Sequence, residues 1–484
     1  MIDILAILLS LGLLMYFAFR GITLLILAPI MALLAALLTG GLPLLASYTQ
    51  IFMVNLGEFA VAFFPLFLLG AVFGKLMDDS GSARAIADWV IGKLGGDRAI
   101  LAVVICCAVL TYGGVSLFVV AFAIYPIAAA LFRDANVPKR LMPATLALGS
   151  FTFTMSALPG TPAIQNAIPM PFFGTTAFAA PGLGIVTGAI MLVLGMVWLT
   201  YRSNQAASAG EGYGAHDDAL PVPDTVMREH AQDEGFDLAE VDSQRPAEQD
   251  QPSFYLAVAP VVFVIAVNFL FLEFVVPNLD TSFLADPLFG NTTIEAVRGV
   301  WAIIVALIIA ILLIIATSYK RFKDLRASIN SGADASVLPI FNTASLVGFG
   351  AVIAALPAFA HLTELVLSVG GGNPLISLAI AVNVLAAMTG SASGGMSIAL
   401  DALGDTYVKL ANETGTSLEA MHRVTAVASG ALDALPHNGA VITVLGICKL
   451  GHNEAYLDMF MVAIVFPLVA LVALITLASL FGAF

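Results

Sequence analysis

A short segment rich in proline and glycine interrupts a long apolar stretch in each half of this chain. The first segment, SALPGTPAI, occupies residues 156–164, and the second, DALPHNGAV, occupies residues 433–441. Both segments should break a membrane helix and leave backbone groups without partners, which a membrane tolerates only where the break lines a cavity. Broken helices at corresponding positions of two halves are typical of a transporter whose binding site lies near the middle of the bilayer.

The composition indicates a membrane protein. Hydrophobic residues make up 60% of the chain and charged residues 11%, against roughly 25% charged residues in a soluble domain. Uncharged runs of about 20 residues, long enough to cross a bilayer, occur at residues 22–46, 174–201, 254–272 and 459–484. A shorter uncharged run at residues 4–19 has no basic residues before it and no cleavage site. We interpret it as a further span and not as a signal peptide.

The acidic residues are concentrated in one segment. Residues 202–252 contain twelve acidic and three basic side chains, and so contribute −9 of the net charge of −14. Because this segment shows no sustained apolar period, we interpret it as a solvated linker between two halves. A regulatory or partner-binding role for the linker is the alternative.

The charges of the loops predict the topology. Loops 133–140 and 320–326 are basic, so the positive-inside rule places them in the cytoplasm. Loops 278–292 and 401–419 are acidic and should face the periplasm. Tracing the spans between these loops places the acidic linker in the cytoplasm and both termini in the periplasm.

The two halves, residues 1–201 and 253–484, contain the same parts in the same order. We predict scaffold spans, an apolar helix pair and a broken helix at residues 1–76, 98–133 and 141–169, and again at 253–318, 374–400 and 421–447, with one more span at 337–357. The loop after the helix pair is basic in one half and acidic in the other, so the halves should have opposite orientations. The predicted fold is an all-α polytopic membrane protein with two inverted-topology repeats, about ten full spans and two re-entrant hairpins.

The hairpins are predicted from the short arms of the two apolar pairs. The arms have about 12 to 16 residues before Gly/Ser/Thr interruptions at residues 111–116 and 389–395, whereas a crossing needs roughly 20. We expect the hairpin tips to meet the broken helices near the midplane, where backbone amides and hydroxyls can bind an anion. The alternative is that these small residues only allow close helix packing.

The placement of basic residues favours a substrate with one negative charge. No Lys or Arg lies deep inside a predicted span, and Arg298 and Arg423 lie at span ends. Neutral donors alone would hold a trianion poorly in a low dielectric, so we predict a small monocarboxylate. The predicted substrate-binding residues come from both interruptions and both breaks: Tyr112, Gly114, Ser116, Gly160, Thr161, Gln165, Asn166, Ser391, Ser393, Gly394, His437, Asn438 and Thr443.

Two ionisable residues, Asp433 and His437, lie in the second break. They are four residues apart, which places them on one helix face if the helix continues that far. Ionisable residues inside a membrane are functional candidates, and histidine titrates near neutrality. We therefore predict that Asp433 or His437 carries a coupled proton. The alternative is a structural hydrogen bond from Asp433 to a hairpin tip.

Several segments resemble the gluconate permease family of proton-coupled carboxylate symporters. They are GAVFGKLMDDSGSARAIA at residues 70–87, LPGTPAI at 158–164, and Ser429-Gly430 followed by His437-Asn438. The resemblance covers most of the chain apart from the linker. It implies a fold of the ion-transporter type, with a dimerising scaffold and a transport domain that moves like an elevator. It also implies uptake of small hydroxy acids, such as gluconate or 3-hydroxybutyrate, across a bacterial inner membrane.

The first break departs from that family. A typical gluconate-type member has a histidine where this chain has Gly160-Thr161-Pro162. This difference favours a smaller, more apolar acid such as 3-hydroxybutyrate or lactate.

Other functional classes fit the sequence less well. The segment GAVFGKL at residues 70–76 lacks the spacing and the Ser/Thr of a phosphate-binding loop, and no His-Glu-x-x-His helix or serine with a basic partner indicates an enzyme. The expected partners are a small carboxylate, membrane lipid and a second copy of the chain, with no nucleic acid, cofactor or metal centre. Proton coupling is the first prediction; a sodium-coupled carboxylate symporter and a cation/proton antiporter remain alternatives.

Overall fold

The computed structural model describes residues 2–20, 22–40, 42–95, 98–219, 251–357 and 359–484, with short pieces at 227–228, 231–232 and 237. Helices are the only regular elements in these residues, so the predicted all-α fold is confirmed. Among the described residues, seven helices are long and apolar enough to cross a membrane: Leu44–Asp79, Leu117–Asp134, Pro181–Ser208, Phe254–Asn278, Ile294–Arg321, Leu325–Ala354 and His452–Phe481.

The first half of the chain begins with the helices α1 (Ile2–Phe19) and α2 (Leu24–Thr39). A short helix, α3 (Leu44–Ala46), and a π-helical turn then lead into the long helix α4 (Met53–Asp79). The remaining helices are α5 (Ser82–Leu94), α6 (Ala99–Tyr112), α7 (Leu117–Asp134), α8 (Met142–Ser150), α9 (Phe153–Ser156), α10 (Ile164–Ala167), α11 (Pro169–Phe173) and α12 (Pro181–Ser208).

The second half begins with two long helices, α14 (Phe254–Leu270) and α15 (Ile294–Ser318). The helices that follow are α16 (Leu325–Ala335), α17 (Val337–Ala354), α18 (Phe359–Val369), α19 (Pro374–Thr389), α20 (Ala392–Thr414), α21 (Leu418–Ser429), α22 (Gly439–Cys448), α23 (His452–Phe460) and α24 (Phe466–Phe481).

Each half contains one helix pair and one break, to which we give fixed names. The first tip, residues 113–116, joins α6 to α7, and the second tip, residues 390–391, joins α19 to α20. The first break, residues 157–163, separates α9 from α10, and the second break, residues 430–438, separates α21 from α22.

Local chemistry explains where the helices stop and restart. In the first break, Pro159 and Pro162 cannot donate a backbone hydrogen bond, and Gly160 has a φ of +83°, which favours glycine. At the second tip, α19 ends at Gly390 in the left-handed region and the Ser391 hydroxyl accepts the first hydrogen bond of α20. After the second break, the Asn438 side chain caps α22 by accepting from the Val441 N–H.

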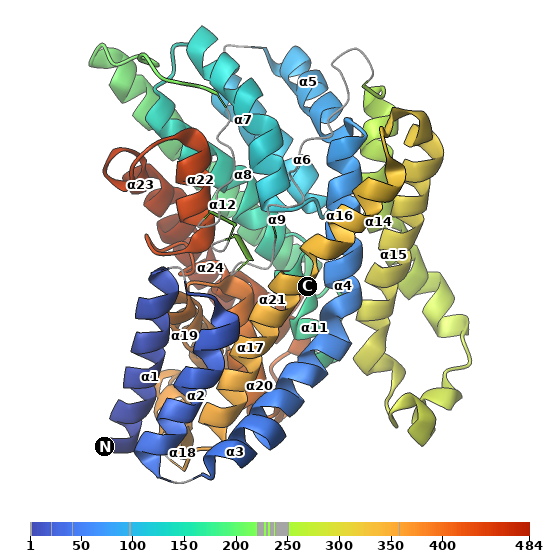
Figure 1. Cartoon of the computed structure of the whole chain (residues 1–484), viewed down its shortest axis with the longest axis vertical. Coiled ribbons are helices and arrows are strands. Elements are labelled where there is room, and N and C mark those ends of the chain that lie inside the picture. The colour runs from blue at the N-terminus through green and yellow to red at the C-terminus, as the bar shows by residue number, and fades with distance from the viewer. Residues whose placement is uncertain are drawn as a thin grey trace.

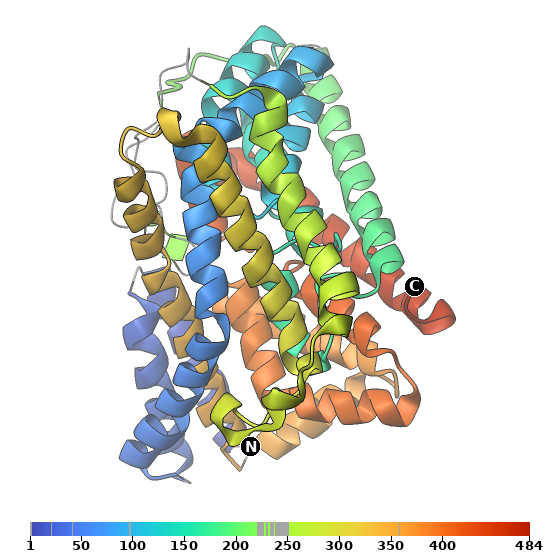
Figure 2. The ribbon, with the colours of Figure 1, turned by 90° about the vertical axis from the view of Figure 1, so that its right-hand side faces the viewer.

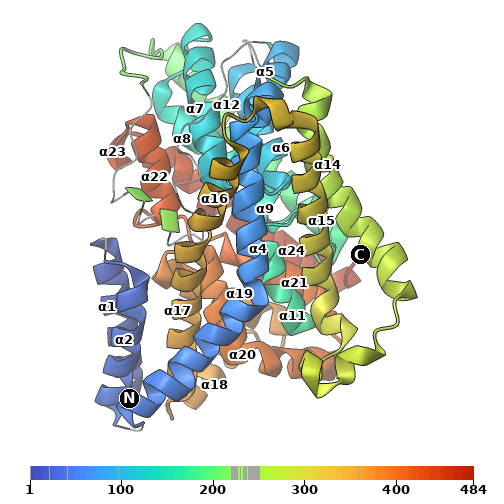
Figure 3. The same cartoon turned by 45° about the vertical axis from the view of Figure 1, so that its right-hand side comes forward.

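The long helix α4 connects the parts of the fold. It runs diagonally from the lower to the upper end of the molecule in Figure 3 and packs against α15, α16 and α17. The basic loops that follow α7 and α15 both lie at the upper end in Figure 1. The acidic loop 278–292 lies at the lower end in Figure 2. The two basic loops therefore lie at the opposite end of the molecule from the acidic loop, as the positive-inside rule requires.

Three helices are longer than the sequence suggested. With 18 and 23 residues, α7 and α20 exceed the predicted hairpin arms. Helix α12 continues past residue 201 to Ser208, into the segment predicted to be a linker. The span predicted at 337–357 corresponds to α17. It is preceded by α16, which was not predicted, and Ser336 joins the two helices into one candidate span, Leu325–Ala354.

Candidate functional site

The first tip packs directly on the first break. The Tyr112 hydroxyl donates a 2.7 Å hydrogen bond to the Pro159 carbonyl, one of the groups that the break leaves without a helical partner. Gly114 has a φ of +92°, and a Cβ atom there would lie 2.6 Å from Cγ of Pro162. Only glycine therefore allows the tip to approach the break so closely.

A cavity of about 50 Å³ lies beside this contact. Its walls come from α4, the first tip, the first break and the junction of α16 with α17: Leu66, Phe67, Gly70, Ala71, Thr111, Gly114, Val115, Ser116, Leu117, Met155, Pro162, Ala163, Ile164, Ala335 and Ser336. The cavity thus joins a helix pair and a broken helix of the first half to a helix of the second half. It is large enough for a small polar group or a few water molecules.

Two polar side chains at this cavity are not satisfied by the protein. The hydroxyls of Thr111 and Ser116 have no hydrogen-bond partner, although the residues are only 3% and 4% exposed. Such groups are rare in proteins and call for an explanation, such as a ligand or water. Helix α7 starts directly after Ser116, so its first backbone amides, which have no intrahelical acceptor, lie beside these hydroxyls. Together they form an environment that favours an anion.

The second tip also packs on its own break, but here the polar groups are paired. The Asn438 side chain donates to the Gly390 carbonyl at 3.0 Å, and Nε2 of His437 lies 3.1 Å from the Ala387 carbonyl. The Ser391 hydroxyl accepts from the Gly394 N–H and lies 3.4 Å from the Ser393 hydroxyl. These side chains therefore hold the tip, the break and the start of α20 together.

Arg423 of α21 connects the second broken helix to the first break. Its side chain is completely buried and donates to the carbonyls of Ser156, Ala177 and Ala179 and to Oδ1 of Asn166, at distances from 2.7 to 3.4 Å. The guanidinium thus satisfies carbonyls around the first break.

The neighbouring His422 completes this connection. Its Nδ1 lies 2.6 Å from the Thr175 hydroxyl, and its Nε2 lies 3.2 Å from Oδ1 of Asn166. Asn166 itself donates to the carbonyls of Thr161 and Ala177. The predicted substrate ligands Thr161 and Asn166 are therefore engaged in the internal structure of the break.

Three basic residues at the ends of predicted spans or in a predicted loop are buried inside the protein. Besides Arg423, Lys75 of α4 is 2% exposed and pairs with Asp79 at 3.1 Å, and Lys139 is 1% exposed. A position near a span end does not place a side chain in water, because other helices cover it. None of these three cations lines the cavity, which presents neutral donors.

The predicted site residues fall into two clusters and not into one site. Gly114 and Ser116 line the cavity, Tyr112 holds the tip beside it, and Gly160 supplies the turn of the first break, where its N–H donates to the Ala177 carbonyl. Ser391, Ser393, Gly394, His437 and Asn438 belong to the second tip and break. Gln165 and Thr443 each have a buried oxygen without a partner, but neither residue lines the cavity.

The sequence reasoning missed Thr111 and the α4 wall of the cavity. Thr111 lies in the interruption between the apolar arms, and Gly70 and Ala71 are consecutive small residues of α4. Those small residues were a signal for close approach to α4, but a sequence alone does not say what approaches.

Asp433 and His437 do not share a helix face, because the helix does not continue as far as these residues. Helix α21 ends at Ser429, so both residues lie in the irregular second break. His437 is directed to α19, where it contacts the Ala387 carbonyl. Their spacing of four residues therefore has no helical meaning here.

This chain is similar to a known protein family and to an individual relative. Residues 14–341 match the model of the citrate transporter family, CitMHS. The uncharacterized transporter YxjC of Bacillus subtilis (strain 168) is 42% identical over 488 residues, which cover 99% of each chain.

Two solved structures have a related fold. Neisseria gonorrhoeae MtrF, described as belonging to a class of antimetabolite efflux pumps, superposes with a TM-score of 0.53 at 12% identity and covers 90% of this chain and 84% of its own. The Alcanivorax borkumensis YdaH transporter gives a TM-score of 0.47 at 15% identity, covering 90% and 88%. At this identity the likeness to MtrF shows the fold alone.

These findings correct the family that the sequence resemblance suggested, the gluconate permeases. The matching family is a different one within the same ion transporter superfamily. A transporter family also agrees with the prediction that the protein is not an enzyme. The chain is a multi-pass membrane protein and a secondary transporter that belongs to the citrate transporter family.

Proposed function

We propose that this protein imports a small carboxylate by symport with a cation, and that the carboxylate binds at the first tip. The observation that carries the proposal is the cavity bordered by the unpartnered hydroxyls of Thr111 and Ser116 at the start of α7. Membership of a carboxylate transporter family supports it.

The geometry suits one carboxylate group. Its two oxygens would accept from the Thr111 and Ser116 hydroxyls and from the first amides of α7, with no basic side chain among the described residues that line the cavity. The net contribution of a hydrogen bond to a charged group is only about 1.5 to 3 kcal/mol, because the bond replaces one that the charged group made to water. Two such hydroxyls therefore account for a substantial part of a millimolar to micromolar affinity.

Two substrate classes compete. The neutral cavity supports a hydroxy-monocarboxylate such as 3-hydroxybutyrate, lactate or gluconate. The family supports a di- or tricarboxylate of the citrate type. One observation favours the second class: Lys75 lies one helical turn beyond Ala71 on α4, on the same face that lines the cavity. If its side chain turned from Asp79 toward the cavity, Lys75 would meet a second carboxylate.

The transport cycle we propose is alternating access of the elevator type. The shared order of helix pair, tip and break in each half supports two inverted repeats with re-entrant hairpins, and the contact of each tip with its own break supports their movement as one block. The helices at 1–76 and 253–318 would form the scaffold and the surface of a homodimer. In the bacterial inner membrane the acidic linker would then face the cytoplasm and both termini the periplasm.

The coupling ion is proposed to be a proton, with sodium as the alternative. Asp433 and His437 are the two ionisable residues of the second break, so protonation at the break can change how it packs on the second tip. A cation/proton antiporter remains the rival class. It predicts ion flux that does not depend on any carboxylate.

The test is uptake into proteoliposomes. Labelled citrate, gluconate, lactate and 3-hydroxybutyrate would be offered under an imposed proton gradient and, separately, an imposed sodium gradient. We expect one acid to accumulate with one gradient, and Lys75→Gln to weaken uptake of a di- or tricarboxylate more than that of a monocarboxylate. Proton flux elicited by sodium in the absence of any acid would replace symport with antiport. Undiminished coupling in the double variant Asp433→Asn, His437→Gln would remove both residues as proton carriers.

A further inference from the structure

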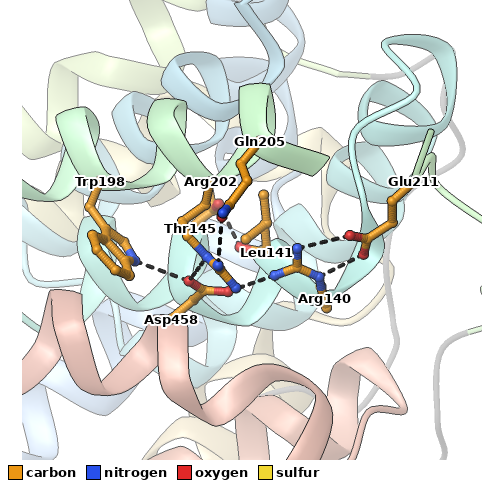
Figure 4. Close-up of polar contacts among 8 residues, drawn as sticks. All are labelled: Arg140, Leu141, Thr145, Trp198, Arg202, Gln205, Glu211 and Asp458. Carbon is orange, nitrogen blue, oxygen red and sulfur yellow. Dashed lines mark hydrogen bonds and ion pairs between the residues drawn. The ribbon is translucent and has the colours of Figure 1, made fainter. Parts of the chain in front are cut away.

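Two basic loops lie at the same end of the molecule, and the first is neutralised by the chain itself. Arg140 makes a two-pronged ion pair with Glu211 at 2.6 and 3.0 Å, and it also donates to the buried Asp458. Figure 4 shows this network, in which Arg202 and Trp198 bind the same Asp458. The hydrogen bonds from Arg140 lower the pKa of the Glu211 carboxyl.

The start of the acidic segment covers the remaining cations near that loop. Lys139 lies 3.0 Å from Asp218, which also pairs with Arg133. Lys449, at the end of α22, lies 2.6 Å from Asp217. The cations of the first basic loop therefore have acidic partners within the protein.

The second basic loop, between α15 and α16, carries four cations and one acid. Lys320, Lys323 and Arg326 are exposed and form no ion pair in the part of the chain that the structure describes. Arg321 donates to a carbonyl at the end of α15, and the acid, Asp324, accepts from a backbone N–H in the first turn of α16. The loop therefore keeps a net positive charge.

This loop also forms a groove of about 590 Å³. Lys323 and Arg326 line it, together with Tyr319 and Phe322. An aromatic wall beside two cations suits a ligand that is anionic at one end and apolar at the other.

The position of the groove indicates which anion it meets. On α15, Ile308 and Leu312 are 41% and 58% exposed, as expected for side chains that face lipid. Tyr319 follows within about two turns and is 65% exposed, and tyrosines at span ends sit at the level of the lipid headgroups. Lysine and arginine reach the same level with their long side chains. The groove therefore continues a lipid-facing surface.

We propose that the groove between α15 and α16 binds the phosphate of an anionic phospholipid, with Lys323 and Arg326, which line it, as cationic ligands and with Lys320 adding positive charge beside it. The headgroup phosphate would lie against Lys323 and Arg326, and the glycerol and the first part of the acyl chains would lie against Tyr319 and α15. Free phosphate shares this chemistry, but it would gain nothing from the apolar wall.

The experiment measures lipid retention by the full-length protein in detergent. Labelled phosphatidylglycerol and phosphatidylcholine would be compared by native mass spectrometry. The wild type should retain phosphatidylglycerol, and each cation removed should weaken retention about fivefold. The triple variant Lys320→Gln, Lys323→Gln, Arg326→Gln should then show no preference between the two lipids. Because the three side chains are exposed, the thermal unfolding of the triple variant should match that of the wild type.

Matched variants and competitors keep the proposal falsifiable. Lys323→Gln should lose affinity, whereas Lys409→Gln, which also removes an exposed lysine, should not. Equal retention in the triple variant and the wild type would overturn the proposal. Displacement of the lipid by millimolar inorganic phosphate would show that a free anion is the ligand. Retention that appears only after deletion of residues 238–250 would show that the acidic segment of this chain occupies the groove instead.

Discussion

At the first tip, two buried hydroxyls have no partner and border a cavity, whereas at the second tip the side chains of Ser391, His437 and Asn438 bond to the backbone of their neighbours. Thr111 and Ser116 represent the first case, and Ser391 and Asn438 the second. The two regions share their order of helices and their contact between tip and break. The difference supports our proposal that the first copy of this arrangement binds a ligand, because the side chains of the second copy already bond to one another and to the backbone.

The asymmetry depends on Arg423, because the second broken helix supplies this residue to satisfy the first break. Replacing Arg423 with Ala would leave two buried carbonyls, those of Ser156 and Ala179, without the donors that Arg423 supplies, each costing about 1 to 3 kcal/mol. We expect this to be the largest effect, a loss of several kcal/mol in the free energy of unfolding, measured as a lower thermal midpoint in detergent. Arg423→Lys should recover part of the loss. Wild-type stability of Arg423→Ala would show that the first break supports itself.

Removing the two cavity hydroxyls should affect transport and spare the fold. In Thr111→Val with Ser116→Ala, the carboxylate loses two donors, so KM should rise roughly 100-fold, about tenfold for each hydroxyl. Stability should stay the same or increase, because two unsatisfied buried groups disappear. Uptake kinetics and thermal unfolding would be measured together.

The control for this variant is Thr187→Val. It removes a buried hydroxyl of α12 that bonds to the Leu183 carbonyl, away from the cavity. We expect a wild-type KM for the control. An unchanged KM in the double variant would remove the first tip from the binding site.

The two tip glycines allow a direct comparison of the two halves. A Cβ at Gly114 would lie 2.6 Å from a rigid proline ring, while a Cβ at Gly390 would lie 3.0 Å from the side chain of His437. Both positions have positive φ, so alanine is strained at each by about 1 kcal/mol. Gly114→Ala should therefore destabilise the protein more than Gly390→Ala in thermal unfolding. The reverse order would mean that the second break is the more rigid one.

The smallest effect is expected at the second tip. Ser391→Ala removes the cap of α20 and should cost about 1 kcal/mol of stability. KM should stay at the wild-type value, because the Ser391 hydroxyl is already engaged. A large rise in KM with normal stability would show that the second tip binds substrate, and the comparison would fail.

Residue chemistry explains which parts of this fold a sequence can predict. Proline and glycine act on their own backbone, so the interruption of the helix around Pro159, Gly160 and Pro162 follows from local rules. The length of α7 and the joining of α16 to α17 depend on packing against other helices, which the sequence does not display. The short segments that resemble gluconate permeases indicated the correct superfamily. Only a match over most of the chain identified the citrate transporter family.

The residues of the candidate site could also be predicted only in part from the sequence. Ser116 could be chosen because a serine before an apolar run predicts a helix start. The role of Arg423 could not be read, because its partners are carbonyls some 240 to 270 residues away along the chain. The helical placement of Asp433 and His437 failed for a related reason: the sequence does not show that α21 ends at Ser429, before both residues.

A structure determined with the transported carboxylate bound tests the central claim most directly. The account predicts density for a carboxylate at the first tip, with one oxygen within hydrogen-bond distance of the Ser116 hydroxyl and the start of α7. Density at the second tip, beside Ser391 and His437, with the first cavity holding only water, would contradict it.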